Sequence, residues 1–284
     1  MKKLSLATAL LLAMTGAQAY QFEVQGQSEF IDNTANQQNY TGAVQGTYYF
    51  KNVDAAKGPL AEAAFLNQAS NVSLAYNYGE YDEASLDIIS HTYGAKAEAY
   101  VPTSVVPVYA SASYSHTIND SKNDAATDDQ GDRYALEVGA VVVPNFLVAV
   151  GYTSVADQAS FDVFNILSNG VAKAAIETQA IGDKKDAITA RTKYVGAIDD
   201  TNMSISFESG LVYGRDTAYA LKTDLFLNPA LSMGVSYAES SFDSANDKAL
   251  GANVNYFVTP AIAVGASYVN AEAATSAQDI QTVG

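Results

Sequence analysis

Histidine and serine are the residues from which hydrolytic chemistry would have to be built in this chain. A hydrolase needs a serine, a histidine and a carboxylate brought together, and the only histidines are His91 and His116, the second of which follows Ser115. Neighbouring residues of a strand point to opposite faces, so Ser115 and His116 cannot act together there. No G-x-S-x-G motif and no paired-histidine metal motif occurs. We therefore predict that the protein is not an enzyme and uses no cofactor.

Acidic side chains are the second group that could do chemistry. The chain holds 31 Asp and Glu against 15 Lys and Arg, with a net charge of −16 and no cysteine, so nucleic acid is not an expected partner. One tract, 119–132, gathers Asp120, Asp124, Asp128, Asp129 and Asp132. Its spacing does not match a calcium loop of the D-x-D-x-D-G form. We predict no metal site, and we expect the tract to attract cations.

Other charged residues recur at every second position of otherwise apolar stretches. In the stretch 93–101, Lys96 and Glu98 alternate with alanines, and this period of two indicates a strand with two different faces. By the same parity, one polar face would carry Glu23, Glu29, Lys51, Lys96, Glu98, Arg133, Glu137, Arg191, Lys193, Glu208, Lys222 and Asp224. On the wall of a pore, charges of both signs tune ion selectivity. Alternatively, they only pair with one another across strands.

About fourteen stretches show this alternation. They span 20–31, 39–51, 70–82, 89–101, 107–118, 131–143, 146–157, 186–198, 202–214, 217–227, 231–241, 247–258, 262–272 and 278–284. Most are longer than the usual 5–6 residues of soluble strands, and long enough for the roughly 9–11 residues with which a tilted strand crosses a bilayer. Tyr and Phe gather near the strand ends, which favours membrane-interface girdles over the core of a soluble β-sandwich.

The six prolines show how these strands connect. Pro59, Pro102, Pro107, Pro144, Pro229 and Pro260 all fall in or beside even-numbered connections, several of which are short. Odd-numbered connections include the acidic tract and a segment of roughly 25 residues around 158–185. Short turns at one end and long polar loops at the other are typical of outer-membrane barrels. We predict an all-β fold: a closed antiparallel up-and-down transmembrane barrel of about fourteen strands.

Two segments break the pattern and are candidates for narrowing such a barrel. The connection around 60–68 has a helix-forming composition and offers Leu60, Glu62 and Phe65. The segment 158–185 offers Phe161 and Phe164. Our hypothesis is that 60–68 folds into the barrel mouth and narrows it, and the alternative is an extra turn packed under the rim. The segment 158–185 is the rival constriction, and the sequence leaves open which segment enters the lumen.

The N-terminus is typical of a secretory signal peptide. Lys2 and Lys3 precede an apolar stretch of about 11 residues that ends in Ala17-Gln18-Ala19. A membrane anchor would need about 20 apolar residues. We therefore expect a signal peptide over 1–19 and a barrel over 20–284.

Several long stretches carry a family resemblance. The segments YQFEVQG, GPLAEAAFLNQASNVSLAYNY, GDRYALEVGA, NFLVAVGYTS, ARTKYVG and VNYFVTPAIAVGASYV resemble the small outer-membrane porins of Acinetobacter, within the putative general bacterial porin family. The resemblance covers nearly the whole chain. It implies a fourteen-stranded barrel that passes water and small solutes, including small nutrients and some β-lactam antibiotics. Such barrels are expected to end in an aromatic residue read by the insertion machinery, whereas Val283-Gly284 ends this chain, so we expect a shortened last strand.

Together these observations predict a monomeric passive channel for water, ions and small hydrophilic solutes in the outer membrane of a Gram-negative bacterium. We expect a mild cation preference. The partners we expect are outer-membrane lipid and lipopolysaccharide, the barrel-insertion machinery and the small solutes themselves. The alternative is a structural or adhesive outer-membrane barrel that does not conduct.

Overall fold

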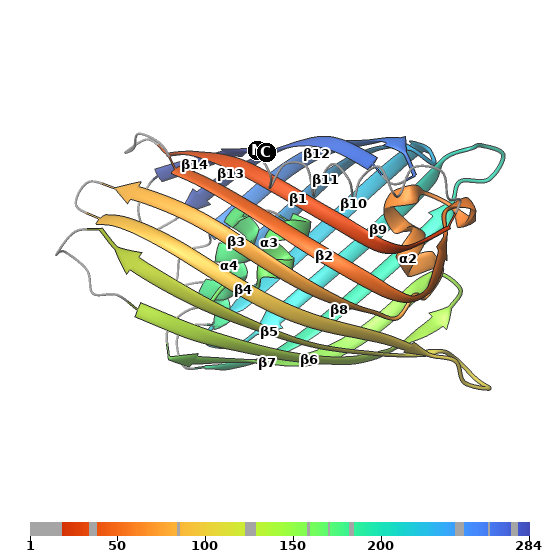
Figure 1. Cartoon of the computed structure of the whole chain (residues 1–284), viewed down its shortest axis with the longest axis horizontal. Helices are drawn as coiled ribbons and strands as arrows, with labels where there is room; N and C mark the ends of the chain where they lie inside the picture. Colours follow the sequence, from red (N-terminus) through yellow and green to blue (C-terminus); the bar gives the residue numbers. More distant parts are fainter. Residues whose placement is uncertain are drawn as a thin grey trace, which may run out of the picture.

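Fourteen antiparallel strands close into a barrel in the computed structural model of this chain (Figure 1). The structure describes residues 19–33, 39–83, 86–122, 129–157, 160–169, 171–181, 185–241, 247–260, 262–273 and 278–284, so the predicted signal peptide lies almost wholly outside the described residues. The strands are β1 (Ala19–Asn33), β2 (Asn39–Asp54), β3 (Asn71–Glu83), β4 (Leu86–Val101), β5 (Val108–Ser121), β6 (Asp129–Val143), β7 (Phe146–Asp157), β8 (Asp186–Ala197), β9 (Ser204–Tyr213), β10 (Thr217–Asn228), β11 (Leu231–Ser240), β12 (Asp247–Thr259), β13 (Ile262–Ala273) and β14 (Gln278–Val283).

Each strand pairs with its sequence neighbours, and β1 pairs with β14 to close the barrel. This confirms the fold class, and all fourteen predicted strands are present with boundaries within three residues of the expected ones. An up-and-down barrel satisfies every ladder position between neighbouring strands. It leaves no open sheet edge that lipid would have to meet.

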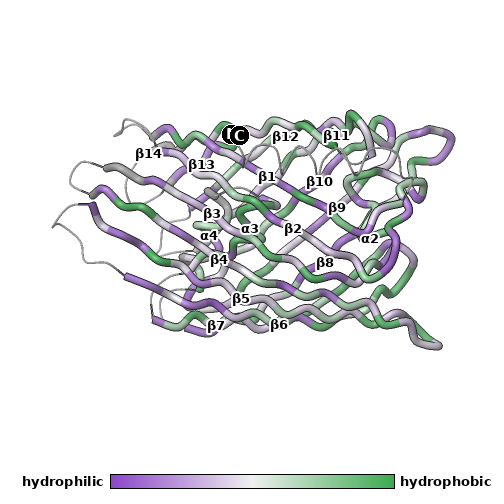
Figure 2. The backbone as a smooth tube through the Cα atoms, in the orientation of Figure 1, coloured by the Kyte–Doolittle hydropathy of each residue, from purple (hydrophilic) through white to green (hydrophobic). Residues whose placement is uncertain are grey.

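The two faces of the sheet are inverted relative to those of a soluble protein. Large apolar side chains such as Val24, Leu74 and Leu136 are exposed on the outside, while polar side chains such as Thr117 and Ser236 are buried inside. Figure 2 shows the resulting alternation of hydrophilic and hydrophobic residues along the strands. An apolar outer band and a polar interior are what a barrel surrounded by acyl chains requires.

All six prolines lie at one end of the barrel, which we call the turn end. There Pro144 is followed by Asn145, whose φ of 71° fits the third position of a type II turn after proline. Proline cannot donate a ladder hydrogen bond, so it marks where pairing stops. The opposite end, which holds the 158–185 connection, is called the loop end.

The connection between β2 and β3 folds back into the turn end of the barrel. This turn-end segment, residues 55–70, contains the short helices η1 (Ala55–Lys57), η2 (Leu60–Glu62) and α2 (Ala63–Leu66). Phe65 packs against inward-facing residues of β5 to β8, including Tyr109 and Leu147. The backbone N–H of Leu60 donates to the carbonyl of Pro229 in the β10–β11 turn at 2.9 Å. The segment therefore reaches across the lumen from β2 to several other strands.

A second connection enters the lumen from the loop end. This loop-end segment, whose described residues are 160–169 and 171–181, contains α3 (Val163–Asn169) and α4 (Val171–Ile181). Both helices lie inside the barrel (Figure 1). None of the described helices is long and apolar enough to cross a membrane.

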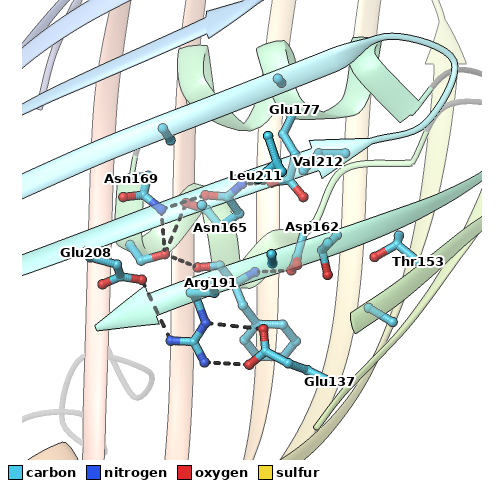
Figure 3. Close-up of a pocket in the computed structure, with 18 of the residues that line it drawn as sticks. Glu137, Thr153, Asp162, Asn165, Asn169, Glu177, Arg191, Glu208, Leu211 and Val212 are labelled. Atoms are coloured by element: carbon cyan, nitrogen blue, oxygen red, sulfur yellow. Dashed lines mark hydrogen bonds and ion pairs between the residues drawn. The ribbon is translucent and has the colours of Figure 1, made fainter. Parts of the chain in front are cut away.

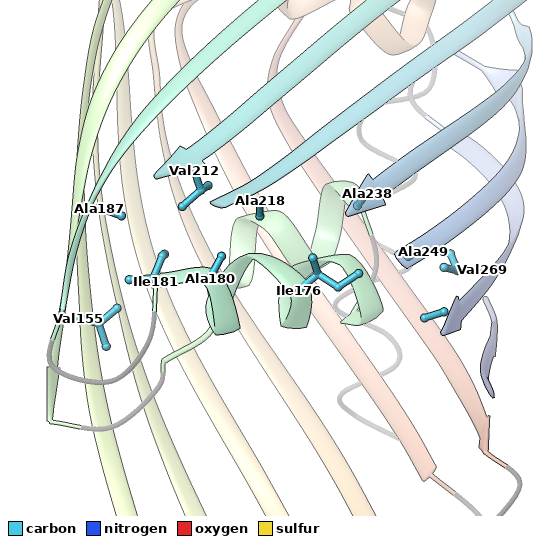
Figure 4. Packing of buried hydrophobic residues seen from close by; sticks show 11 residues of the cluster. Val155, Ile176, Ala180, Ile181, Ala187, Val212, Ala218, Ala238, Ala249 and Val269 are labelled. Carbon is cyan, nitrogen blue, oxygen red and sulfur yellow. The ribbon is translucent and has the colours of Figure 1, made fainter. Parts of the chain in front are cut away.

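The two helices of the loop-end segment pack on different walls. The apolar side of α3 packs against Ala43 of β2 and Ala75 of β3. Helix α4 packs through Ile176 and Ile181 on a patch of small inward residues (Figure 4). That patch consists of Val155, Ala187, Val212, Ala218, Ala238, Ala249, Val269 and Ala271. The small side chains leave room for a helix within the barrel.

Candidate pore and the two segments inside it

A chain of charged and phenolic groups crosses the inner wall from β4 to β8. The Lys96 ammonium lies 3.0 Å from Glu98, which accepts a 2.7 Å hydrogen bond from the Tyr109 hydroxyl. The Arg191 guanidinium donates to the Tyr109 oxygen at 3.1 Å and to Glu137 at 2.6 Å. Figure 3 shows Arg191 extending between Glu137 and Glu208. Because these residues come from β4, β5, β6 and β8, the chain is held rigidly by the sheet.

Glu208 on β9 is shared by two cations of the neighbouring strand. Its carboxylate lies 3.8 Å from Arg191 and 3.7 Å from Lys193. On its other side, Lys222 of β10 is its direct cross-strand neighbour and lies 3.9 Å from Asp224. Longer distances mean weaker ion pairs, so Glu208 is bound less tightly than Glu98 and Glu137 are.

Lys193 has a closer partner, and that partner is not on the wall. Glu62, at the end of η2 in the turn-end segment, lies 2.9 Å from the Lys193 ammonium. The same ammonium stands 5.3 Å above the ring of Phe65, a cation–π arrangement. A lysine of β8 thus holds both a carboxylate and an aromatic ring of the segment that enters from the turn end.

Arg133 on β6 forms ion pairs with the loop-end segment. Its side chain is only 3% exposed, and its Nη2 lies 2.5 Å from Glu177 of α4 and 3.9 Å from Asp162. Asp162 also caps α3, accepting from the backbone N–H of Phe164 at 3.0 Å. Glu177 in turn accepts from the Asn165 amide. One buried arginine therefore contacts both helices.

Lys51 stands apart from the other predicted lumen charges. Lys51 is exposed near the turn end of β2, within the stretch where the register with β1 jumps from the Tyr20–Val53 pair to the Phe22–Tyr48 pair. Tyr49 and Val53, two residues to either side of Lys51, are both buried, so the place of Lys51 on the lumen wall stays a prediction. Lys51 is not part of the ion-paired lumen group.

The remaining predicted positions lie inside. Glu23 accepts a 2.8 Å hydrogen bond from the inward-facing Tyr49 hydroxyl. Glu29 is buried and accepts from Gln27. Asp224 is buried and accepts from Asn253 at 3.1 Å.

The structure also places the constriction candidates. Phe65 and Phe164 are buried in the packing of the turn-end and loop-end segments, and Phe161 packs beside the second. Leu60 lines a cavity next to Glu62. The sequence left open which segment enters the lumen, and the structure shows that both do.

Three cavities lie against these segments in the part of the chain that the structure describes, and two of them border Arg191 or Lys193. One of about 280 Å³ lies between the loop-end segment and the wall, beside Lys96, Arg191 and Glu137. Another of about 440 Å³ lies beside the turn-end segment at Glu62 and Lys193. Both are lined by Ser168, Asn169, Glu208 and Lys222. The cavities therefore adjoin next to the end of α3.

The described residues contain no cluster that could hold a metal ion. His116 faces outward and contacts Asp132 at 2.8 Å, whereas Ser115 is buried. The two residues point to opposite sides of β5, as the sequence indicates.

Sequence reasoning missed Asp162, Glu177 and Tyr109, which organise the charged groups. It also missed Gly94 of β4, where a Cβ would lie 2.3 Å from Val163 of α3. A signal for the loop-end segment existed: each of β8 to β13 has an inward alanine or valine near the loop end, whereas a water-filled lumen favours polar residues there.

The comparisons with known proteins agree with this geometry. A profile of the family described as putative general bacterial porin matches residues 1–284. Outer membrane protein Omp33 of Acinetobacter baumannii, a solved structure, is 50% identical, with a TM-score of 0.70 over 94% of this chain and 97% of that one. The comparison with curated proteins found no match.

Two other solved structures are similar only in outline. Outer membrane phospholipase A from Escherichia coli is 10% identical, with a TM-score of 0.39 over 94% of this chain and 96% of that one. The translocator domain of the autotransporter NalP from Neisseria meningitidis is 8% identical, with a TM-score of 0.40 over 99% and 93%. At that level of similarity, neither structure bears on what this chain does.

Proposed function

Because this chain belongs to the putative general bacterial porins, we propose that it is a passive outer-membrane channel for water, ions and small hydrophilic solutes. The observation that carries the proposal is the lumen itself: two adjoining cavities, lined by charged groups of both signs, lie between the inner segments and the wall. The similarity of this chain to an outer membrane protein of Acinetobacter baumannii supports a location in the outer membrane of a Gram-negative cell. Action as a monomer, with lipid, lipopolysaccharide and the insertion machinery as partners, belongs to this proposal.

A mild cation preference is the finer part of the proposal. Among the described side chains that face the lumen, acids outnumber bases. The acids are Glu23, Glu29, Glu62, Glu98, Glu137, Asp162, Glu177, Glu208 and Asp224; the bases are Lys96, Arg133, Arg191, Lys193 and Lys222. A net negative wall raises the local concentration of cations.

One observation favours the alternative of a barrel that does not conduct. Segments from both ends occupy the lumen, and each packs buried apolar side chains against the wall. If both stayed in place permanently, the protein would be a structural or adhesive barrel.

Reconstitution into planar bilayers separates the two functions. We expect the purified full chain to conduct in potassium chloride, and a variant lacking residues 60–68 to conduct more because the turn-end segment is gone. In a salt gradient, the reversal potential should show a mild preference for potassium. If neither protein conducts while both are folded barrels, the channel function is wrong; a clearly anion-selective potential contradicts only the cation preference.

A further inference from the structure

The lumen cations differ in where their nearest carboxylate comes from. For three of them the nearest carboxylate is on the wall: Glu98 for Lys96, Glu137 for Arg191 and Asp224 for Lys222. Two cations take theirs from the inner segments instead: Arg133 from Glu177 and Lys193 from Glu62. Wall pairs are fixed by strand register, whereas a segment pair forms only while the segment is in the lumen.

Of these two, the pair at Lys193 is the one a solute could enter. Arg133 is only 3% exposed. The Lys193 side chain is 19% exposed and the Glu62 side chain 11% exposed, and both line the 440 Å³ cavity beside the turn-end segment. A water molecule occupies about 30 Å³, so this cavity has space for a small organic ion next to the pair.

The chemistry of the pair identifies the kind of solute. Lys193 presents an ammonium, a strong donor to carboxylate oxygens. Its second carboxylate, Glu208, is 3.7 Å away and is shared with Arg191. Losing Glu62 would therefore leave the Lys193 ammonium short of a close acceptor. The group that fits the vacancy is one that resembles the glutamate side chain: a carboxylate on a short carbon chain.

We propose that Lys193 is a binding site for the carboxylate of small organic acids, and that Glu62 occupies this site as an internal stand-in when the turn-end segment is in place. The proposal rests on the proposed channel function. A carboxylate that binds Lys193 displaces Glu62, and the segment then loses its ion pair with the wall. Small organic acids therefore favour the open state of the turn end, and they bind there at Lys193.

Most contacts of the turn-end segment are with β2, the strand from which it starts: Ala63 and Ala69 pack on Tyr49 and Val53, and Asn67 donates to the Asp54 carbonyl. Across the lumen, the Glu62–Lys193 pair is accompanied by the Leu60–Pro229 backbone hydrogen bond and by the packing of Phe65. A hydrogen bond to a charged group typically contributes roughly a factor of ten to an equilibrium. Releasing Glu62 should shift the ratio of open to closed turn ends by about that factor.

The test compares salts of one cation in planar bilayers containing the full chain. Acetate moves through water more slowly than chloride, so a non-selective water-filled pore has a lower conductance when acetate replaces chloride at constant potassium. For the wild-type protein we expect a higher conductance in potassium acetate than in potassium chloride. Glu62→Gln should raise the open fraction in chloride by about tenfold and abolish the gain from acetate. Lys193→Gln should do the same, which guards against a folding defect peculiar to one variant.

Lys96→Gln is the matched control, since Lys96 pairs with Glu98 on its own strand and should keep the acetate response. The inference is overturned if wild-type conductance falls in acetate, or if Glu62→Gln opens the channel while acetate has no effect on the wild type. If no folded variant conducts, including the one lacking 60–68, the channel function itself is wrong, and that result is distinct from failure of the carboxylate site.

Discussion

The two segments inside the barrel are held in different ways. The loop-end segment buries Val163, Phe164, Ile166, Leu167, Ala174, Ile176, Ala180 and Ile181 against two opposite walls. The turn-end segment buries Ala63, Phe65 and Ala69. The ion pair of the first involves a buried arginine, whereas the lysine in the pair of the second is partly exposed.

This difference indicates which end is able to open. Burial of apolar area contributes roughly 25 cal/mol per Å², so the loop-end segment gains much more from staying in place. The turn-end segment is short and depends more on a single ion pair. We infer that the loop-end segment is a fixed part of the lumen wall, which solutes pass beside, and that the turn-end segment is the part that moves.

The largest expected effect follows from neutralising the acid that faces the buried arginine. Glu177→Gln leaves the Arg133 charge with Asp162 at 3.9 Å as its remaining partner. Removing one member of a buried pair costs about 3 kcal/mol or more. Hydrogen exchange of the α3 and α4 amides should speed up by roughly a hundredfold while the strands stay protected. Unchanged exchange in the helices would mean that apolar packing alone holds the segment.

A smaller effect is expected from removing the aromatic anchor of the turn-end segment. Phe65→Ala loses packing on Tyr109 and Leu147, which we expect to cost about 2 kcal/mol, less than a fully enclosed phenylalanine. Conductance should rise, since the segment leaves the lumen more often. Leu136→Ala, on the exposed outer face, is the control and should leave conductance unchanged. A rise in both variants would point to a general loosening of the barrel.

A third prediction concerns the glycine that lets α3 approach the wall. In Gly94→Ala, the new Cβ would lie 2.3 Å from Val163, and such overpacking costs about 1 kcal/mol or more. Exchange in α3 should speed up by about fivefold to tenfold. Gly210→Ala is the control, because nothing lies within 4 Å of its Cβ position. Equal effects of the two substitutions would exclude close approach as the reason for Gly94.

The smallest effect is expected from a wall carboxylate that holds neither segment directly. Glu208→Gln removes one negative charge from the lumen while Lys193 keeps Glu62 at 2.9 Å. The reversal potential in a salt gradient should move toward chloride by a few millivolts, with little change in open fraction. A large rise in open fraction would show that Glu208, too, holds the turn end closed.

Strand positions and faces were predictable because they depend on local rules. Lys96 and Glu98 share a face because residues two apart always do in a strand, and Pro144 ends a strand because it cannot donate a ladder bond. Counting by twos did not show the register shift of β1 and β2 beside Lys51, between the Tyr20–Val53 and Phe22–Tyr48 pairs. An irregularity of that kind depends on what the neighbouring strand and the following segment need, and no local pattern shows it.

The pairs that define the site were less accessible. Glu62 and Lys193 were each identified as candidates, yet they lie far apart in the sequence and in different kinds of structure. Arg133 was expected on the wall, but its partner Glu177 sits in a connection whose fold had no periodic signal. Nothing local says how far a loop reaches into a lumen.

By itself, the sequence determined that fourteen amphipathic strands must roll into a barrel with its apolar face outward, since alternation, turn chemistry and the need to pair every backbone group act between neighbours along the chain. Only the tertiary structure decided that the barrel is filled from both ends, and which acid meets which base inside it. Those contacts depend on closure, which brings strands from opposite ends of the sequence around one space and lets the connections compete for it.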